Sequence, residues 1–295
     1  MFINKKLNKL YHQSRVIMFD SSSKFIILSD CHRGQGNHSD NFLPNQNIFY
    51  AALDYYYHNN YTYIEIGDGD ELWENRNIDD IIQAHTDAFQ LMSKFYYSNR
   101  LYMLYGNHDM VKRNKKFCNN SFCNYYNKTD DYKVPLFPEI SVYESLLLKN
   151  KQSSIEIFLI HGHQGDLLND TLWLVGRWLV RYIWQPIEQI GFTAPANGAR
   201  TYKSKNKIEE ALSQYANSAN TILIAGHTHR PAFSPPGEAL YFNDGSCVHP
   251  SCITGIEICN DEISLIKWSV KPNNHNILFI TKDILDGPIN LNLYF

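Results

Sequence analysis

Short apolar runs that stop at polar clusters recur five times along the chain. The runs are Lys24–Ser29, Tyr61–Ile66, Leu101–Tyr105, Ile155–Ile160 and Thr221–Ala225. Runs of this length, rich in Ile, Leu, Tyr and Phe, are typical of buried strands. Each is followed by Asp, Asn, Gly or His, the residue types that gather at the ends of strands in layered α/β proteins.

The segments around these runs complete a layered pattern. Asn47–Asn59 and Ile78–Ser98 have the spacing of helices, so the chain begins β-α-β-α-β. Three further strands are predicted near the C-terminus, at Ala239–Val248, Ile253–Ile258 and Glu262–Val270. This order predicts an α/β (α+β layered) fold in which two mixed β-sheets form a sandwich flanked by helices. No internal repeat or low-complexity linker divides residues 1–295, so we expect a single domain.

Two insertions interrupt this pattern. Lys112–Pro138 is polar, has little periodicity and is predicted to be a surface loop. Residues 166–217 are predicted to form a helical cap insertion. Within it, Leu172–Phe192 carries one narrow polar stripe and is otherwise apolar, as in a helix that is buried against the body or that caps a site. Basic residues follow, either as a solvated turn or as a rim that faces phosphate: Arg200, Lys203, Lys205 and Lys207.

Composition and charge narrow the class of protein. The chain has 295 residues, 44% of them hydrophobic, and a net charge of −3, which excludes disordered and fibrous chains and gives no strong nucleic-acid signal. Met1–Arg15 lacks the features of a secretory signal, and Leu172–Phe192 carries too many polar residues for a transmembrane span. Six cysteines without a CxxC motif favour reduced thiols over zinc or disulfides, so we expect a cytoplasmic protein.

Seven metal-ligand side chains follow the predicted strands. Asp30 and His32 are two residues apart, as are His227 and His229, and in extended chain each pair would face one side. The complete set is Asp30, His32, Asp68, Asn107, His161, His227 and His229. Seven ligands exceed the needs of one ion, and two cations about 3.5–4 Å apart that share a carboxylate would use them all. Because no thiolate is involved, Mn is expected, with Fe or Zn as alternatives.

Other histidines and carboxylates are given lesser roles. His163 and Asp166 are expected to support the ligands rather than to bind metal. Asp40, His38 and His85 do not follow predicted strands and are expected to lie at the surface.

The ordered motifs resemble those of the calcineurin-like metallophosphoesterases. They are Asp30-x-His32, Gly67-Asp68-x-x-Glu71, Gly106-Asn107-His108-Asp109, His161 and Gly226-His227-x-His229. The resemblance implies two sheets that hold a dinuclear centre between their edges. It places Asp30, His32, Asp68 and His229 on one ion and Asp68, Asn107, His161 and His227 on the other. It also implies that His108 is the general acid and that Glu71 orients it.

A closer similarity links the chain to the UDP-diacylglucosamine pyrophosphohydrolases. It rests on the segment Gly67–Trp73, on Gly226–Pro231 and on a basic helical insertion. The chain departs from those enzymes at His108, where they usually carry Arg. The similarity implies a small-molecule or lipid-linked phosphate substrate.

We therefore expect a phosphoester or pyrophosphate hydrolase that uses a metal-bridging hydroxide and His108 as general acid. Arg33 and Arg230, together with Arg200 and Lys203, are candidate phosphate contacts, with plain surface charge as the alternative for Arg33 and Arg230. Two other functions stay open. One is a nuclease or cyclic-nucleotide phosphodiesterase with the same centre, and the other is a non-catalytic scaffold, which the complete ligand set disfavours. The oligomeric state does not follow from the sequence.

Overall fold

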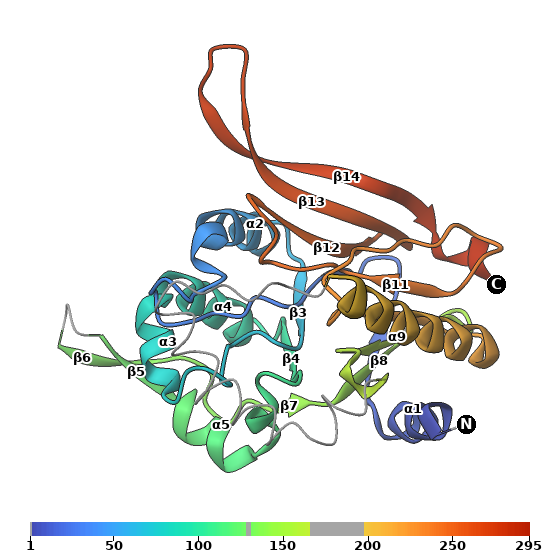
Figure 1. Ribbon diagram of the computed structural model, residues 1–295, viewed down its shortest axis with the longest axis horizontal. Helices are drawn as coiled ribbons and strands as arrows, with labels where there is room; N and C mark the ends of the chain where they lie inside the picture. The colour runs from blue at the N-terminus through green and yellow to red at the C-terminus, as the bar shows by residue number, and fades with distance from the viewer. Residues whose placement is uncertain (1, 128–130, 166–197) are drawn as a thin grey trace.

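Two β-sheets form the centre of the protein (Figure 1). The computed structural model describes residues 2–127, 131–165 and 198–295. The first sheet runs in the order β1 (Arg15–Phe19), β8 (Ser145–Asn150), β9 (Glu156–Ile160), β10 (Ile222–Ala225) and β11 (Tyr241–Asn243). The second runs β14 (Leu278–Asn290), β13 (Glu262–Pro272), β12 (Cys252–Cys259), β2 (Lys24–Leu28), β3 (Thr62–Ile66), β4 (Leu101–Leu104) and β7 (Val142–Tyr143).

Helices cover the outer faces of the two sheets. The helices α2 (Gln46–His58), α3 (Ile78–Ala84) and α4 (Thr86–Tyr97) belong to the seven-stranded side. The five-stranded side carries α1 (Phe2–Gln13) and α9 (Gly198–Ala219). One apolar cluster fills the space between the sheets and under α9, and a second lies between the seven-stranded sheet and α2 to α4. The predicted fold class is therefore confirmed.

All five predicted apolar runs are strands, namely β2, β3, β4, β9 and β10. The strands β2, β3 and β4 are parallel neighbours, and so are β9 and β10. Their carboxyl ends therefore bring the polar clusters together. The predicted helix Asn47–Asn59 is α2, whereas Ile78–Ser98 is divided at His85 into α3 and α4. The described part of the predicted cap, residues 198–217, belongs to α9, and Leu172–Phe192 lies outside the described residues.

The prediction of a surface loop at Lys112–Pro138 is wrong. This segment contains α5 (Lys115–Ser121) and the hairpin β5 (Asn124–Asn127) and β6 (Tyr132–Pro135). Three of its apolar residues, Phe122, Leu136 and Phe137, are fully buried in the second cluster. A sparse set of large side chains anchors the segment, and their irregular spacing hid this role.

The C-terminal strands also differ from the prediction. Only Tyr241–Asn243 of the predicted strand Ala239–Val248 is a strand, and it pairs with β10 in the five-stranded sheet. The next two strands, β12 and β13, join the other sheet, where the unpredicted β14 pairs with β13 along most of its length.

The buried anchor gives a first prediction. Phe137→Ala should lower the free energy of unfolding by about 3–5 kcal/mol, because it removes a fully buried ring from the second cluster. Lys133→Ala, on the exposed side of β6, is the matched control and should change stability by less than about 0.5 kcal/mol. Urea unfolding followed by circular dichroism measures both. Equal stability of the two variants would contradict the packed description of this segment.

Candidate metal centre

Hydrogen bonds between loops bring the candidate ligands together. The backbone of Asp30 donates to Gly67 O (3.1 Å), and that of His32 donates to Asp68 O (2.9 Å). Across the sandwich, His161 Nδ1 donates to Ile66 O at the end of β3 (3.0 Å). These bonds continue the pairing of the strands past their ends, so the loops after β2, β3 and β9 meet at one point.

Five of the seven candidate ligands have left-handed backbone conformations. Asp30, His32, Asp68, His227 and His229 have φ between 47° and 67°. The two pairs with i, i+2 spacing are therefore not in extended chain, which corrects the reasoning that predicted their convergence. Left-handed backbone costs a non-glycine residue about 1–2 kcal/mol, and such strain collects at functional sites.

The first cluster consists of Asp30, His32 and His229. His229 Nε2 lies 3.0 Å from Asp30 Oδ1, and the Nε2 atoms of the two histidines are 3.3 Å apart. His32 Nδ1 donates to Glu71 Oε2 (2.9 Å), which turns Nε2 toward the cluster. A second hydrogen bond of this kind is what orients a metal-binding imidazole.

The second cluster consists of Asp68, His161 and His227. Asp68 Oδ2 lies 3.2 Å from His161 Nε2 and 3.8 Å from His32 Nε2 of the first cluster. Asp68 therefore faces both groups, as a bridging ligand must. The Nδ1 of His161 is occupied by Ile66 O, so its Nε2 is the atom available to an ion.

A buried oxygen without a donor supports a fit to cations. Within the described residues, Asn107 Oδ1 receives no hydrogen bond, although the side chain is buried. Burial of an unsatisfied polar atom is costly, and metal coordination is one of the ways to offset that cost. Two clusters of hard oxygen and imidazole nitrogen, with Asp68 facing both, fit a pair of divalent ions.

Asp30 and His227 have the charges of metal ligands, whereas His161 would release a proton on binding an ion. Burial lowers the pKa of His161, but Asp68 and Asp30 outweigh burial and raise it to about 9. Burial raises the pKa of Asp30, but the imidazoles of His229 and His161 outweigh burial and hold it well below its usual range. Burial and the neighbouring His161 lower the pKa of His227 to about 3, so this ring is neutral at pH 7. A carboxylate and a neutral imidazole are the forms that bind metal.

His108 lies beside the clusters, and Glu71 and Trp73 fix its ring. Its Nδ1 donates to Glu71 Oε1 (2.8 Å), and its ring stacks on Trp73 with 4.2 Å between centroids. Trp73 Nε1 also donates to Asn107 O (2.6 Å). Burial lowers the pKa of His108, but Glu71 and Asp68 outweigh burial and raise it, which favours the imidazolium. The side chain is 24% exposed, so it faces the open side of the site.

The candidate phosphate contacts lie in different environments. Arg33 is fully buried and bonded to Glu65 and Asp70, so this guanidinium is turned away from substrate and the expectation of a phosphate contact is corrected. Arg230 Nε donates to Glu209 of α9 (3.1 Å). Arg200 and Lys203 belong to α9, but their side chains are outside the described part of the chain. Lys205 Nζ donates to Thr228 O, between His227 and His229 (2.6 Å).

Two residues near the site, Trp73 and Asp244, were missed by the sequence analysis. Trp73 was noted only as part of a motif, although it fixes His108. Asp244 is fully buried and accepts a hydrogen bond from Ser29 Oγ (2.8 Å), and Ser29 also bonds to Asp30. His163 is buried beside His161, as expected of a supporting residue, whereas Asp166 lies outside the described residues.

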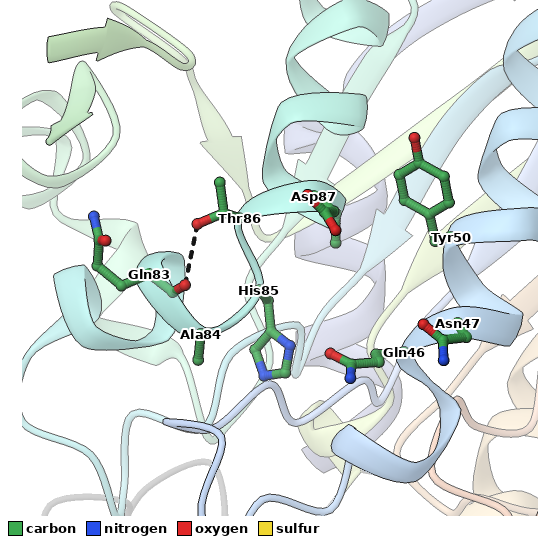
Figure 2. Close-up of a pocket in the computed structure, with 9 residues that line it drawn as sticks. Gln46, Asn47, Tyr50, Gln83, Ala84, His85, Thr86 and Asp87 are labelled. Carbon is green, nitrogen blue, oxygen red and sulfur yellow. Dashed lines mark hydrogen bonds between the residues drawn. The ribbon is translucent and has the colours of Figure 1, made fainter. Parts of the chain in front are cut away.

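Asp40 and His85 were predicted to lie at the surface, and this prediction is wrong. Both are buried, and His85 Nε2 lies 2.8 Å from Asp40 Oδ2. His38 is exposed, as expected. His85 also lines a hollow of about 320 Å³ at the start of α2 and the junction of α3 with α4, which Figure 2 shows. None of its lining residues is a candidate ligand, so this hollow is separate from the metal centre.

Comparison with known proteins places the chain in a family. Residues 23–231 match the calcineurin-like phosphoesterase family, and this range includes all seven candidate ligands. The chain therefore belongs to that family. No curated protein matches it closely enough to count as a relative.

None of the described helices is long and apolar enough to cross a membrane.

Two solved structures are similar to this chain. A predicted phosphoesterase from Streptococcus pneumoniae TIGR4 is 14% identical, with a TM-score of 0.36, and the match covers 89% of this chain and 97% of that one. Vps29 from Chaetomium thermophilum is 9% identical, with a TM-score of 0.38, and the match covers 90% and 97% of the two chains.

Gly106 gives a direct test of the position of Asp68. A Cβ atom at residue 106 would lie 2.1 Å from Asp68 Oδ1. Gly106→Ala should therefore displace the shared carboxylate and weaken Mn²⁺ binding by about 10–100-fold, the range found when the support of a metal ligand is lost. Calorimetric titration with Mn²⁺ measures the effect.

Gly237→Ala is the control for this test, because its Cβ would meet no atom within 4 Å, although its φ of +88° strains the backbone. It should bind Mn²⁺ as the wild type does. Unchanged Mn²⁺ binding in Gly106→Ala would contradict the placement of Asp68 as a ligand.

Proposed function

We propose that this chain is a hydrolase of phosphoester or pyrophosphate bonds that works with two divalent transition-metal ions, with Mn²⁺ expected and Fe or Zn as alternatives. One observation carries the proposal: Asp68 of one ligand cluster lies 3.8 Å from His32 of the other, and His108 lies beside them, held by Glu71 and Trp73. Family membership supports the same class of reaction.

Asp30, His32, Asp68 and His229 would hold one ion, and Asp68, Asn107, His161 and His227 the other. When bound, the ions supply Lewis acidity, which lowers the pKa of water to about 7 and neutralises phosphoryl oxygens. The protein then has to place the substrate and to provide a proton for the leaving group.

His108 is the proton donor in this proposal. Glu71 occupies its Nδ1 and favours the protonated ring, so the proton on Nε2 is the one that can pass to the leaving oxygen. Burial raises the pKa of Glu71, but His108 and His32 outweigh burial and lower it to about 2, so Glu71 stays an anion at neutral pH. Trp73 restricts the ring to one plane. Glu71 thus orients a ligand, His32, and the acid at the same time.

The substrate we propose is a small or amphiphilic phosphate compound in the cytoplasm. Similarity of the motifs to UDP-diacylglucosamine pyrophosphohydrolases supports it, as does the position of Lys205, whose ammonium group is bonded to Thr228 O at the rim of the site, between His227 and His229. Arg230, Arg200 and Lys203 are proposed to add positive charge on the α9 side of this rim. Hydrolysis assays with Mn²⁺ on phosphomonoesters, diesters, nucleoside diphosphate sugars and lipid-linked diphosphates test the substrate class. Cleavage of diesters alone would favour a nuclease or cyclic-nucleotide phosphodiesterase.

The role of His108 predicts a dependence on the leaving group. His108→Ala should keep its metal ions but lose about 10²–10⁴ in kcat on an alkyl phosphate, whose leaving oxygen needs a proton. With p-nitrophenyl phosphate the loss should be much smaller, because p-nitrophenolate leaves as an anion. Steady-state kinetics and elemental analysis provide the two measurements.

His38→Ala makes the same substitution at an exposed histidine and should match the wild type on both substrates. An equal loss of kcat by His108→Ala on both substrates would contradict its role as general acid. Activity that survives complete removal of metal would contradict the proposed reaction itself.

A further inference from the structure

Five charged side chains form a buried network beneath the site. Four of them are 0% exposed and Lys112 is 1% exposed; the set is Arg33, Glu65, Asp70, Asp109 and Lys112. Charged residues are almost never fully buried unless they are paired. Replacing such a network with apolar residues is often neutral or stabilising, so stability alone is a weak reason for its presence.

Arg33 forms one half of this network. Its two terminal nitrogens donate to the two carboxylate oxygens of Glu65, at 2.8 and 3.0 Å, and its Nε donates to Asp70 Oδ1 at 2.7 Å. The backbone of the loop after β3 passes directly over this pair. A Cβ atom on Gly69 would lie 2.1 Å from Glu65 Oε1, so only glycine fits there. Gly69 is the neighbour of Asp68, and the pair therefore supports the backbone next to the shared ligand.

Asp109 and Lys112 form the other half and join two loops. Asp109 Oδ1 accepts a hydrogen bond from Gly106 N (2.7 Å), and its Oδ2 accepts one from Gly69 N (3.1 Å). Lys112 Nζ lies 2.6 Å from Asp109 and 2.7 Å from Asp70. One carboxylate thus holds the glycine next to Asp68 and the glycine next to Asn107.

The bonded atoms flank ligands on both loops but touch no ligand side chain. Gly69 follows Asp68, whereas Gly106 and Asp109 enclose Asn107 and His108 in the sequence. A shift between the two loops would therefore separate Asp68 from Asn107. It would also break the hydrogen bond from His108 N to Asp68 Oδ1 (2.8 Å), which crosses the same gap.

We propose that Asp109 and Lys112, supported by Arg33, Glu65 and Asp70, are positioning residues that hold the Asp68 loop against the Asn107–His108 loop. The inference rests on the proposed function and assigns the network a task within it. The ion held by Asp68, Asn107, His161 and His227 depends on both loops. The other ion depends on the Asn107 loop for none of its ligands.

Lys112→Met tests this assignment, because Met retains an unbranched stem but removes the charge that joins Asp70 to Asp109. Calorimetric titration with Mn²⁺ should show that one of the two ions binds about 10–100-fold more weakly, whereas the other, which shares Asp68 but has no ligand in the Asn107 loop, is weakened less. The kcat on a small ester should fall by a similar factor, and KM should change little. Arg33→Lys, which keeps the charge but loses the two-pronged bond to Glu65, should show a smaller effect of the same kind.

Glu257→Gln is the matched control. Glu257 of β12 also lies in a polar cluster, where it accepts hydrogen bonds from Tyr56 (2.9 Å), Tyr61 (3.0 Å) and Lys282 (2.9 Å), but none of these groups belongs to the site. It should bind both Mn²⁺ ions as the wild type does, even if its melting temperature falls. This control separates loss of positioning from loss of stability.

A folded Lys112→Met that binds two Mn²⁺ ions with wild-type affinity would overturn the positioning role, whatever the activity. If Lys112→Met does not fold, Asp109→Asn decides in the same titration, since the amide has nearly the same shape and keeps an oxygen for Gly106. Wild-type affinity in that variant would equally overturn the role. A wild type that binds two Mn²⁺ ions but cleaves no phosphate compound would overturn the proposed function and leave the titration readable.

Discussion

The position of Asp68 is the constraint on which the site depends. Its carboxylate is buried, lies 3.2 Å from His161 and 3.8 Å from His32, and accepts a hydrogen bond from His108 N. It therefore connects both ligand clusters and the acid-bearing loop through a single side chain. Gly106 leaves room for it, and a Cβ there would overlap one of its oxygens. A displacement of this carboxylate would disturb both clusters together.

The fold holds this group in place with backbone bonds and strain rather than with regular secondary structure. The ligand loops bond to one another past the ends of β2 and β3, and Asp30, His32 and Asp68 all have left-handed φ. Non-glycine residues keep such conformations only where the surroundings fix them. Here the parallel strands and the buried charged side chains beneath the loops, among them Arg33, Asp109 and Lys112, surround the backbone at these positions. The fold thus fixes Asp30 and Asp68 beside imidazoles of the two clusters.

The surroundings of Arg33 and Lys112 show how support and reaction are divided. The side chains of Arg33 and Lys112 are buried beneath the loops among carboxylates. By contrast, the side chains of His108 and His229 are 24% and 31% exposed on the open side. Lys205 of α9 reaches the backbone between His227 and His229 from that region. In the proposed division, charges beneath the site fix its geometry, and charges at its rim face the substrate.

The sequence by itself determined the five strands that the candidate ligands follow and the identity of those ligand-type residues. Short apolar runs must be buried, and polar residues that follow parallel strands must meet at one edge, so Asp30, Asp68 and His161 were found without coordinates. Only the tertiary structure decided the state of Arg33, Asp40 and His85, because the burial of a charge depends on partners such as Glu65 that are distant in sequence. It also showed that Lys112–Pro138 is packed and that Trp73 fixes His108. Local sequence patterns show which residues are polar, whereas partners that are distant in the sequence decide which of those polar residues can be buried.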